Sequence, residues 1–186
     1  MFLFVGLGNP TPNSENNRHN IGFKIIDAIN SKFKLSKQKP KFKGLLTTGS
    51  INEKKVYAIK PLTFMNNSGI CIRELIEYFK IEAENIIVFH DDLDIDFGKI
   101  KTKFGGSSAG HNGIESIDKF IGKDYSRVRI GIGKPNDKIT VSDYVLKDFD
   151  DDEKQELETL KNSITENLAI LIDRKLDLFS STVNNK

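Results

Sequence analysis

The segment Ile86-Ile87-Val88-Phe89-His90-Asp91-Asp92 decides the fold that this sequence predicts. Its four apolar residues in an unbroken run are typical of a short strand that is buried on both faces, near the centre of a sheet. Three polar residues follow directly. Because α/β proteins place their sites at the carboxyl ends of central strands, we expect this strand to deliver polar side chains to a site.

Strands and helices alternate on both sides of this segment. Apolar spacing predicts further strands at 1–5, 45–50, 56–60, 100–104, 127–131 and 141–145, and helices that begin near 21, 66 and 114. A last helix is expected over about 150–175, followed by a short polar tail. The pattern predicts one α/β domain over residues 1–186, a three-layer fold with a mixed, twisted sheet flanked by helices.

Charge is distributed unevenly along the chain. The net charge of +2 is too small to indicate nucleic-acid binding by itself. However, residues 32–60 contain nine Lys and one acid, whereas residues 148–158 contain seven acids and one Lys. The basic stretch is either a docking surface for a polyanion, with the acidic stretch facing away, or a solvated Lys-rich edge.

The single cysteine, Cys71, cannot form an internal disulfide, which is typical of an intracellular protein. No window approaches the roughly 20 apolar residues that a membrane-spanning helix requires. We therefore expect a cytoplasmic protein without a membrane segment. A monomer is expected, because the sequence indicates no exposed apolar surface that would have to be buried against a partner.

Two glycine-containing motifs were tested for nucleotide or nucleophile chemistry. Gly6-Leu7-Gly8 lacks the third glycine of a dinucleotide-binding loop, since Thr11 stands there. The segment 106–110 matches G-x-S-x-G, but no His lies well downstream of it, which excludes a nucleophile elbow. A phosphate-binding loop at a helix N-terminus is the favoured interpretation of residues 105–113.

The acidic run Asp92-Leu93-Asp94 resembles the start of a calcium-binding loop, but Phe97 replaces the required glycine. The cluster of His90 with Asp91, Asp92 and Asp94 could still bind a hard cation in another geometry. A metal-dependent phosphodiesterase or nuclease therefore remains an alternative function.

The predicted loops share a high content of amides beside titratable groups. The amides are Asn9, Asn20, Asn66, Asn67 and Asn112, and the titratable groups beside them are His19, Asp91 and His111. A His with a carboxylate partner, and without a credible Ser or Cys nucleophile, indicates general-base activation of water. Each residue alone is better explained as a helix cap or a strand-end hydrogen-bonding group, and only the joint pattern favours catalysis.

That joint pattern resembles the bacterial peptidyl-tRNA hydrolase family. The resemblance extends from Val5 to about Tyr144 and is far more specific than any one motif. The matching segments, in order, are Val5-Gly6-Leu7-Gly8-Asn9-Pro10, Arg18-His19-Asn20-Ile21-Gly22, Lys60-Pro61-Leu62-Thr63-Phe64-Met65-Asn66, His90-Asp91-Asp92-Leu93-Asp94, Gly110-His111-Asn112-Gly113 and Arg127-Val128-Arg129-Ile130-Gly131-Ile132-Gly133.

The resemblance implies a catalytic domain that hydrolyses the ester between a peptide and tRNA. It implies that His19 is the base that activates water and that Asp91 orients it. Asn9, Asn66 and Asn112 would surround the base and hydrogen-bond water, carbonyl or peptide, with Asn9 separating blocked from unblocked aminoacyl groups. An ester is activated enough for a base and amide donors alone, so no metal or other cofactor is expected.

The resemblance also implies the residues that contact the substrate. Phe64 and His111 would line the site, and Lys101, Lys103 and Arg129 would contact tRNA phosphates, which suits a substrate class that spans many tRNAs. Peptidyl-tRNA is the implied partner. A non-catalytic RNA-binding module is the second alternative, and hydrolysis separates it from an enzyme.

The chain departs from the family pattern after Asn9-Pro10. The family has Gly and then Tyr in this loop, whereas this sequence has Thr11 and Ser14. Ser14 offers no aromatic surface to a substrate, and Pro12 restricts the path of the loop.

Overall fold

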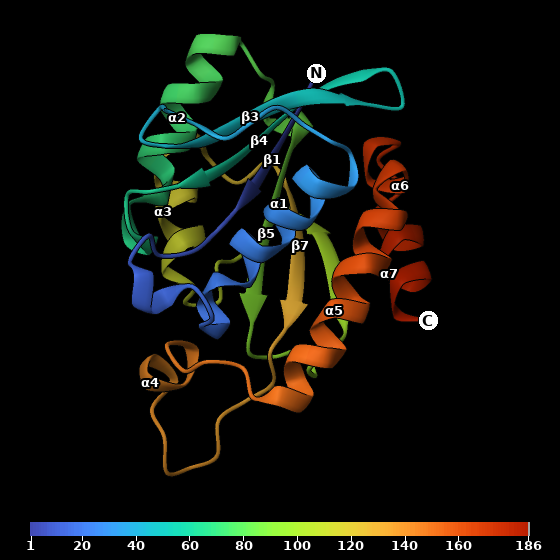
Figure 1. Cartoon of the computed structure of the whole chain (residues 1–186). Coiled ribbons are helices and arrows are strands. Elements are labelled where there is room, and N and C mark those ends of the chain that lie inside the picture. The colour runs from blue at the N-terminus through green and yellow to red at the C-terminus, as the bar shows by residue number, and fades with distance from the viewer. Residues whose placement is uncertain (186) are drawn as a thin grey trace.

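A seven-stranded mixed sheet forms the centre of the molecule (Figure 1), and the computed structural model describes residues 1–185. Its strand order is β2-β3-β4-β1-β5-β7-β6. β4, β1, β5 and β7 are parallel, whereas β2, β3 and β6 extend the two edges by antiparallel pairing. The strands are β1 (Phe2–Gly6), β2 (Lys39–Lys41), β3 (Gly44–Ile51), β4 (Lys54–Pro61), β5 (Ile86–Asp92), β6 (Ile100–Phe104) and β7 (Ser126–Gly131).

Helices cover both faces of this sheet, as the alternating pattern predicted. In Figure 1, α2 and α3 lie on one face, and α1, α5, α6 and α7 lie on the other. The α-helices are α1 (Ile21–Lys32), α2 (Ser68–Phe79), α3 (Asn112–Ile121), α4 (Val141–Val145), α5 (Asp151–Glu166), α6 (Leu168–Ile172) and α7 (Leu176–Asn184). Short 3-10 turns are η1 (Pro12–Ser14), η2 (Arg18–Asn20), η3 (Met65–Asn67) and η4 (Ala83–Asn85).

The central strands are apolar throughout because both of their faces are buried. Phe4 and Phe89 project into the core beneath α1 and α5, while Val5 and Val88 project into the core beneath α2 and α3. Every residue of β1 and β5 is buried, including the polar end of β5. Asp91 is therefore held on a rigid strand end rather than on a mobile loop.

Two glycines allow α1 to approach β1 at backbone distance. A Cβ on Gly6 would lie 2.2 Å from the carbonyl oxygen of Gly22, and a Cβ on Gly22 would lie 2.3 Å from the amide nitrogen of Leu7. Neither contact is compatible with a larger side chain. The approach fixes η2, the turn directly before α1, at the carboxyl ends of the parallel strands.

Three sequence predictions about secondary structure were wrong. Residues 141–145 form α4 rather than a strand, because Thr140 caps a helical turn by accepting a hydrogen bond from the amide of Asp143. The predicted helix over 150–175 is divided into α5 and α6, and α7 follows. The expected polar tail is helical, since Phe179 and Val183 pack into the core.

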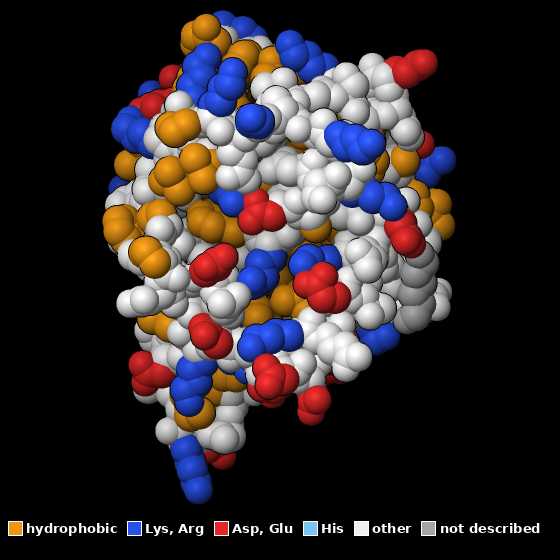
Figure 2. Space-filling view, viewed as in Figure 1, with side chains coloured by type: hydrophobic (Ala, Val, Ile, Leu, Met, Phe, Trp, Pro, Cys, Tyr) orange, Lys and Arg blue, Asp and Glu red, His pale blue; other side chains and the backbone are white. Residues whose placement is uncertain are grey.

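The basic and acidic segments lie toward opposite ends of the molecule. Lys and Arg side chains are frequent over the end of the molecule near the β3–β4 turn, whereas acidic side chains are more frequent at the opposite end, where α5 begins (Figure 2). Glu153 of α5 pairs with Arg18, the neighbour of His19 in sequence. The acidic segment thus contacts the turn that carries His19.

None of the helices in residues 1–185 has the length and apolar character that a membrane-spanning helix requires.

Candidate active site

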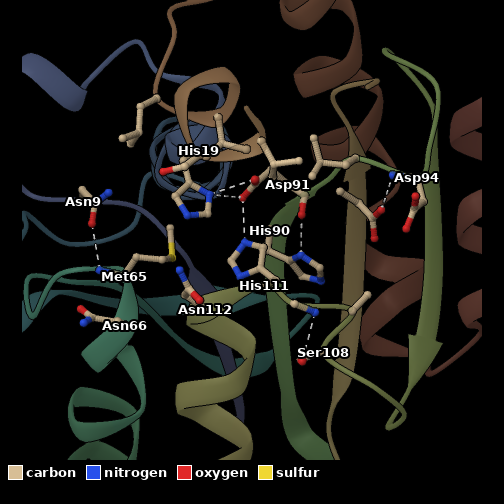
Figure 3. A pocket seen from close by; sticks show the side chains of 18 of the residues that line it. Asn9, His19, Met65, Asn66, His90, Asp91, Asp94, Ser108, His111 and Asn112 are labelled. Atoms are coloured by element: carbon tan, nitrogen blue, oxygen red, sulfur yellow. Dashed lines mark hydrogen bonds and ion pairs between the residues drawn. The ribbon is translucent and has the colours of Figure 1, made fainter. Parts of the chain in front are cut away.

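Three segments that are distant in sequence meet at the carboxyl ends of the parallel strands. η2 contributes His19, the end of β5 contributes Asp91, and the residue before α3 contributes His111 (Figure 3). They border a cavity of about 1050 Å³. These are the loops that the sequence predicted, after the first strand, after Phe89 and after Phe104.

His19 is oriented by the carboxylate of Asp91. Its Nδ1 lies 2.9 Å from both oxygens of Asp91. A carboxylate accepts hydrogen bonds, so Nδ1 carries the hydrogen and Nε2 keeps its lone pair. Among the described residues, Nε2 has no hydrogen-bond partner, and His19 lines the cavity. This tautomer leaves a basic nitrogen available to a molecule in the cavity.

Asp91 is ionised although it is buried. Burial acts to raise its pKa, but interactions with His111 and then His19, including a hydrogen bond from each ring, outweigh burial and lower the pKa below its usual value. A permanently charged carboxylate is what the orientation of His19 requires.

His90 is a site residue that the sequence analysis did not single out by itself. It lines the cavity, and its Nδ1 donates to the backbone carbonyl of Asp91 at 2.8 Å. Burial, together with nearby His111, lowers the pKa of His90 to about 3. His90 is therefore neutral near pH 7 and contributes packing and orientation rather than proton transfer.

Asn9 lies opposite His19 with a defined amide orientation. Its Oδ1 accepts from the amide nitrogen of Met65 at 2.8 Å, which leaves its NH₂ group available to the cavity. Asn20 clamps the backbone of Asn9 by accepting from its amide at 2.9 Å and donating to its carbonyl at 2.9 Å. The sequence analysis did not identify Met65 as a site residue. Its position directly before Asn66, in the same motif, was the feature that could have identified it.

Phe64, Asn66 and Asn112 line the cavity, as expected of substrate contacts. All three side chains are exposed, and no hydrogen bond within the described residues occupies the amides of Asn66 or Asn112. Phe64 has φ 61° and ψ 159°, a backbone conformation that is otherwise typical of glycine. The site therefore presents free amides and one aromatic ring held in a strained position.

Lys101, Lys103 and Arg129 lie beside the cavity rather than in its lining. Lys101 is opposite Arg129 in the β6–β7 pairing, so the cations share one face of the sheet. Lys101 is exposed, Lys103 donates to the carbonyl of Ser107 at 2.9 Å, and Arg129 pairs with Asp92 at 2.9 Å. They form a cationic edge next to the site.

The glycine-rich loop does not have the geometry of a phosphate-binding loop. Its carbonyls from Gly106 and Ser107 accept hydrogen bonds from Arg127, which is 1% exposed and also pairs with Asp118. The first amides of α3 are occupied by the ring of His111. The carbonyl groups of the loop therefore face the buried guanidinium of Arg127. The amides of Gly113 and Ile114, at the N-terminus of α3, are not available to bind a phosphate.

The three aspartates of the alternative metal site do not converge. Asp92 is engaged by Arg129 and by the amide of Asp94, and Asp94 pairs with Lys134 at 3.1 Å. In the described part of the chain, the only close group of metal-type ligand atoms, all within 4.8 Å, belongs to His19, Asp91 and His111. Those atoms are already joined by hydrogen bonds. The Asp91-Asp92-Asp94 cluster of the alternative function is not formed in the described residues.

No side chain in the described residues is placed to act as a nucleophile beside His19. Burial raises the pKa of Cys71 to about 12, which keeps it a thiol. The hydroxyls of Ser107 and Ser108 accept hydrogen bonds from backbone amides of their own loop. Water is the remaining attacking group.

The segment around α4 closes one side of the cavity, which the sequence analysis missed because it predicted a strand there. Val141 and Leu146 are exposed and line the cavity. Arg18 anchors this segment: its guanidinium donates to the carbonyl of Asp148 at 2.7 Å and lies over the ring of Tyr144 at 4.6 Å. The turn that carries His19 and the α4 segment are therefore fixed to each other.

Ser14, where the family pattern has Tyr, is buried and does not line the cavity. Its hydroxyl hydrogen-bonds the hydroxyl of Thr11. Position 14 therefore stabilises its own loop in this chain.

The fold and this geometry define a hydrolase that uses water. A carboxylate-oriented imidazole faces a cavity with free amides, and a cationic edge lies next to it. A family model described as peptidyl-tRNA hydrolase matches residues 3–186. The chain belongs to the peptidyl-tRNA hydrolase family.

Individual relatives agree with this assignment. A peptidyl-tRNA hydrolase from Pelagibacter ubique is 79% identical over the full length of both chains. One from Bartonella henselae is 45% identical over 99% of this chain and 95% of that protein. The crystal structure of peptidyl-tRNA hydrolase from Acinetobacter baumannii superposes with a TM-score of 0.92 at 33% identity, covering 99% of this chain and 94% of that one.

Proposed function

We propose that this chain hydrolyses the ester that links a peptide to tRNA, and that His19 is the general base. The observation that carries the role of His19 is the pair of 2.9 Å contacts from its Nδ1 to Asp91. They leave Nε2 unprotonated on the cavity side. The activity itself is that of the family to which the chain belongs.

The proposed reaction needs one proton acceptor and no covalent intermediate. Nε2 of His19 takes a proton from water as the oxygen bonds to the ester carbonyl carbon. The ester C–O bond then breaks and the imidazolium returns the proton to the ribose oxygen, so that a tRNA hydroxyl and a peptide carboxylic acid are released. The acid then loses its proton to solvent and becomes the carboxylate. Asp91 stabilises the imidazolium that exists between these steps.

The free amides have the chemistry that such a reaction requires. Negative charge develops on the carbonyl oxygen, and hydrogen-bond donors placed in advance lower its energy. The NH₂ group of Asn9 is directed away from Met65 and is available for this purpose or for the peptide backbone. We assign Asn66 and Asn112 to the same set, and Phe64 to the wall that the substrate contacts.

We assign tRNA binding to the cationic edge of Lys101, Lys103 and Arg129. Arg129 and Lys101 are neighbours across β6 and β7, at the end of the sheet where the cavity lies. Contacts of this kind neutralise phosphates without reading bases. We also propose that residues 1–186 act as one catalytic domain, as a monomer, in the cytoplasm, where the substrate arises during translation. Light scattering and cell fractionation test these assignments.

Hydrolysis of an N-blocked aminoacyl-tRNA tests the proposal directly. Wild type and His19→Ala are compared with and without EDTA, with unblocked aminoacyl-tRNA as the specificity control. We expect chelator-resistant cleavage of the blocked substrate, and a loss of about 10²–10⁴ in kcat for His19→Ala, the usual contribution of a general base. Near-wild-type turnover of the variant would overturn the role of His19.

The same assay separates the two alternatives. Cleavage that EDTA abolishes and a divalent ion restores would indicate a metal enzyme. Binding of the tRNA without any cleavage would indicate an RNA-binding module. A thermal melt of His19→Ala confirms that the variant is folded before its activity is interpreted.

A further inference from the structure

Both ring nitrogens of His111 are engaged inside the protein. Nδ1 accepts from the backbone amides of Gly113 at 3.1 Å and Ile114 at 3.3 Å, which makes His111 the N-cap of α3. Nε2 lies 2.8 Å from Oδ1 of Asp91. A ring with this arrangement has little left to offer a substrate, although sequence comparison suggested a substrate contact.

The two contacts determine the protonation state of His111. Two N–H groups point at Nδ1, so Nδ1 must present a lone pair and cannot carry a hydrogen. The hydrogen is then on Nε2, which donates to Asp91. A proton added to Nδ1 would face the two amides and break the cap of α3. The two contacts therefore specify the Nε2–H tautomer of the neutral ring.

We infer that His111 is a positioning residue that acts on His19 through Asp91. Its hydrogen bond to Oδ1 fixes the rotation of the Asp91 carboxylate, so that both carboxylate oxygens lie 2.9 Å from Nδ1 of His19. The inference rests on the proposed role of His19 as the base. It goes beyond that proposal because it assigns the ring of His111 a hydrogen bond to Asp91 rather than a contact with the substrate.

The helix connects this arrangement to the rest of the site. The N-terminal end of α3 carries partial positive charge, and the His111 ring joins it to the negative charge of Asp91. The same cap fixes the backbone of Asn112, the first residue of α3. The titratable groups that face Asp91 are His19 from η2 and His111, and His90 packs against His111 with ring centroids 4.9 Å apart.

A pair of variants separates positioning from substrate contact. His111→Asn retains an N-cap residue, because Asn is among the favoured residues at this position, but it removes the hydrogen bond to Asp91. His111→Ala removes both interactions. Helix content and thermal stability should fall more in His111→Ala than in His111→Asn. This comparison shows whether α3 is still folded in His111→Asn, the variant whose kinetics test the inference.

We expect His111→Asn to lower kcat by about 10- to 100-fold, the value of one hydrogen bond to a charged group, with little change in KM. The pH profile should also change. With one donor fewer, Asp91 attracts the imidazolium form of His19 more strongly, so the acid-side loss of activity should move to higher pH. A raised KM with unchanged kcat and an unchanged pH profile would show a substrate contact instead.

A measurement without substrate keeps the inference separate from the proposed function. ¹⁵N NMR of the wild-type imidazoles should show the neutral ring of His111 as the Nε2–H tautomer. An Nδ1–H form of His111 would overturn the inference. If the protein did not hydrolyse peptidyl-tRNA while this tautomer was present, the proposed function would fail instead.

Discussion

At the level of single residues, Phe64 is held in a conformation that ordinary side chains avoid. Its φ of 61° with ψ of 159° places it in a region that only glycine adopts easily, at a strain of about 1–3 kcal/mol. The ring is 52% exposed at the cavity, so the strain is not offset by burial. A contact between the Phe64 ring and the substrate would explain why the chain keeps this strained conformation.

Phe64→Gly should therefore stabilise the protein and weaken substrate binding. We expect the free energy of unfolding to rise by about 1 kcal/mol, after allowance for the entropy of glycine in the unfolded chain, and KM to rise. Urea denaturation and steady-state kinetics measure the two effects. Phe104→Gly is the matched control, because Phe104 is 53% exposed in a regular strand and its replacement should only destabilise.

The sequence was informative about which residues meet, and less so about how they bond. His19, Asp91 and Asn9 were predicted together and lie together. The position of hydrogens on His111 depends on the amides of α3, and the strain at Phe64 depends on backbone torsions, so neither can be read from residue types. Arg127 was part of a quoted motif, but its burial beneath the glycine-rich loop follows only from the β6–β7 pairing.

At the level of elements, the contact between α1 and β1 determines where His19 lies. A methyl group on Gly22 would be 2.3 Å from the backbone nitrogen of Leu7 and 2.5 Å from the carbonyl oxygen of Phe89. Neither strand can retreat within a seven-stranded sheet. The helix would have to move, and η2 would move with it.

Gly22→Ala should destabilise the protein by about 3 kcal/mol, the upper end of the usual range for overpacking, and should lower kcat even where the protein is folded. Chemical denaturation gives the first quantity, and kinetics well below the melting temperature give the second. Ser31→Ala, an exposed position on the same helix, should change stability by less than about 0.5 kcal/mol. Equal effects of the two substitutions would contradict the packing argument.

The errors in secondary structure also have physical causes. The apolar stripe continues from α5 into α6, so periodicity alone shows no break. The break occurs because Asn167 donates to the carbonyl of Ser163 at 2.8 Å and ends α5. Residues 141–145 contain β-branched and aromatic side chains typical of strands, but the sheet is already completed by β6 at that edge.

At the level of the whole molecule, tRNA should bind along the β6 edge rather than over the Lys-rich stretch. Lys101→Ala removes one exposed cation from that edge, so KM should rise and the slope of log KM against log salt should flatten by about one unit. Lys175→Ala is the control, since Lys175 is exposed near Met1, at the end of the sheet opposite the active site. Equal salt slopes for wild type and Lys101→Ala would exclude a phosphate contact.

Acid should destabilise the fold well above the pH at which carboxylates titrate. The pKa of His90 is about 6.5 in a free chain and about 3 in the fold, so between these values the unfolded chain binds a proton that the folded protein does not. Stability is complete above pH 6.5 and falls as pH falls toward 3, with a limiting slope of about 1.4 kcal/mol per pH unit. The lowered pKa of Asp91 adds a loss in the same direction below its ordinary value.

His90→Asn tests the source of this acid sensitivity. Asn retains a donor for the carbonyl of Asp91 but does not titrate, so the variant should lose stability at neutral pH and show a flatter dependence on pH between about 6.5 and 4. Denaturant titrations at several pH values measure it. An unchanged dependence would show that another group is responsible.

The chain has three histidines, and His19 and His90 both pack against the ring of His111 in the active site. This arrangement has a practical consequence. Between about pH 5.5 and 7, Lys, Arg, Asp and Glu side chains keep their ordinary charges, so the surface that attracts RNA is nearly constant. A loss of hydrolysis in mild acid would therefore originate in the three histidines of the site rather than in weaker docking of the nucleic acid. Crystals grown near pH 5.5 with intact substrate are a route to trapping the complex before the ester is cut, with the native sequence in place.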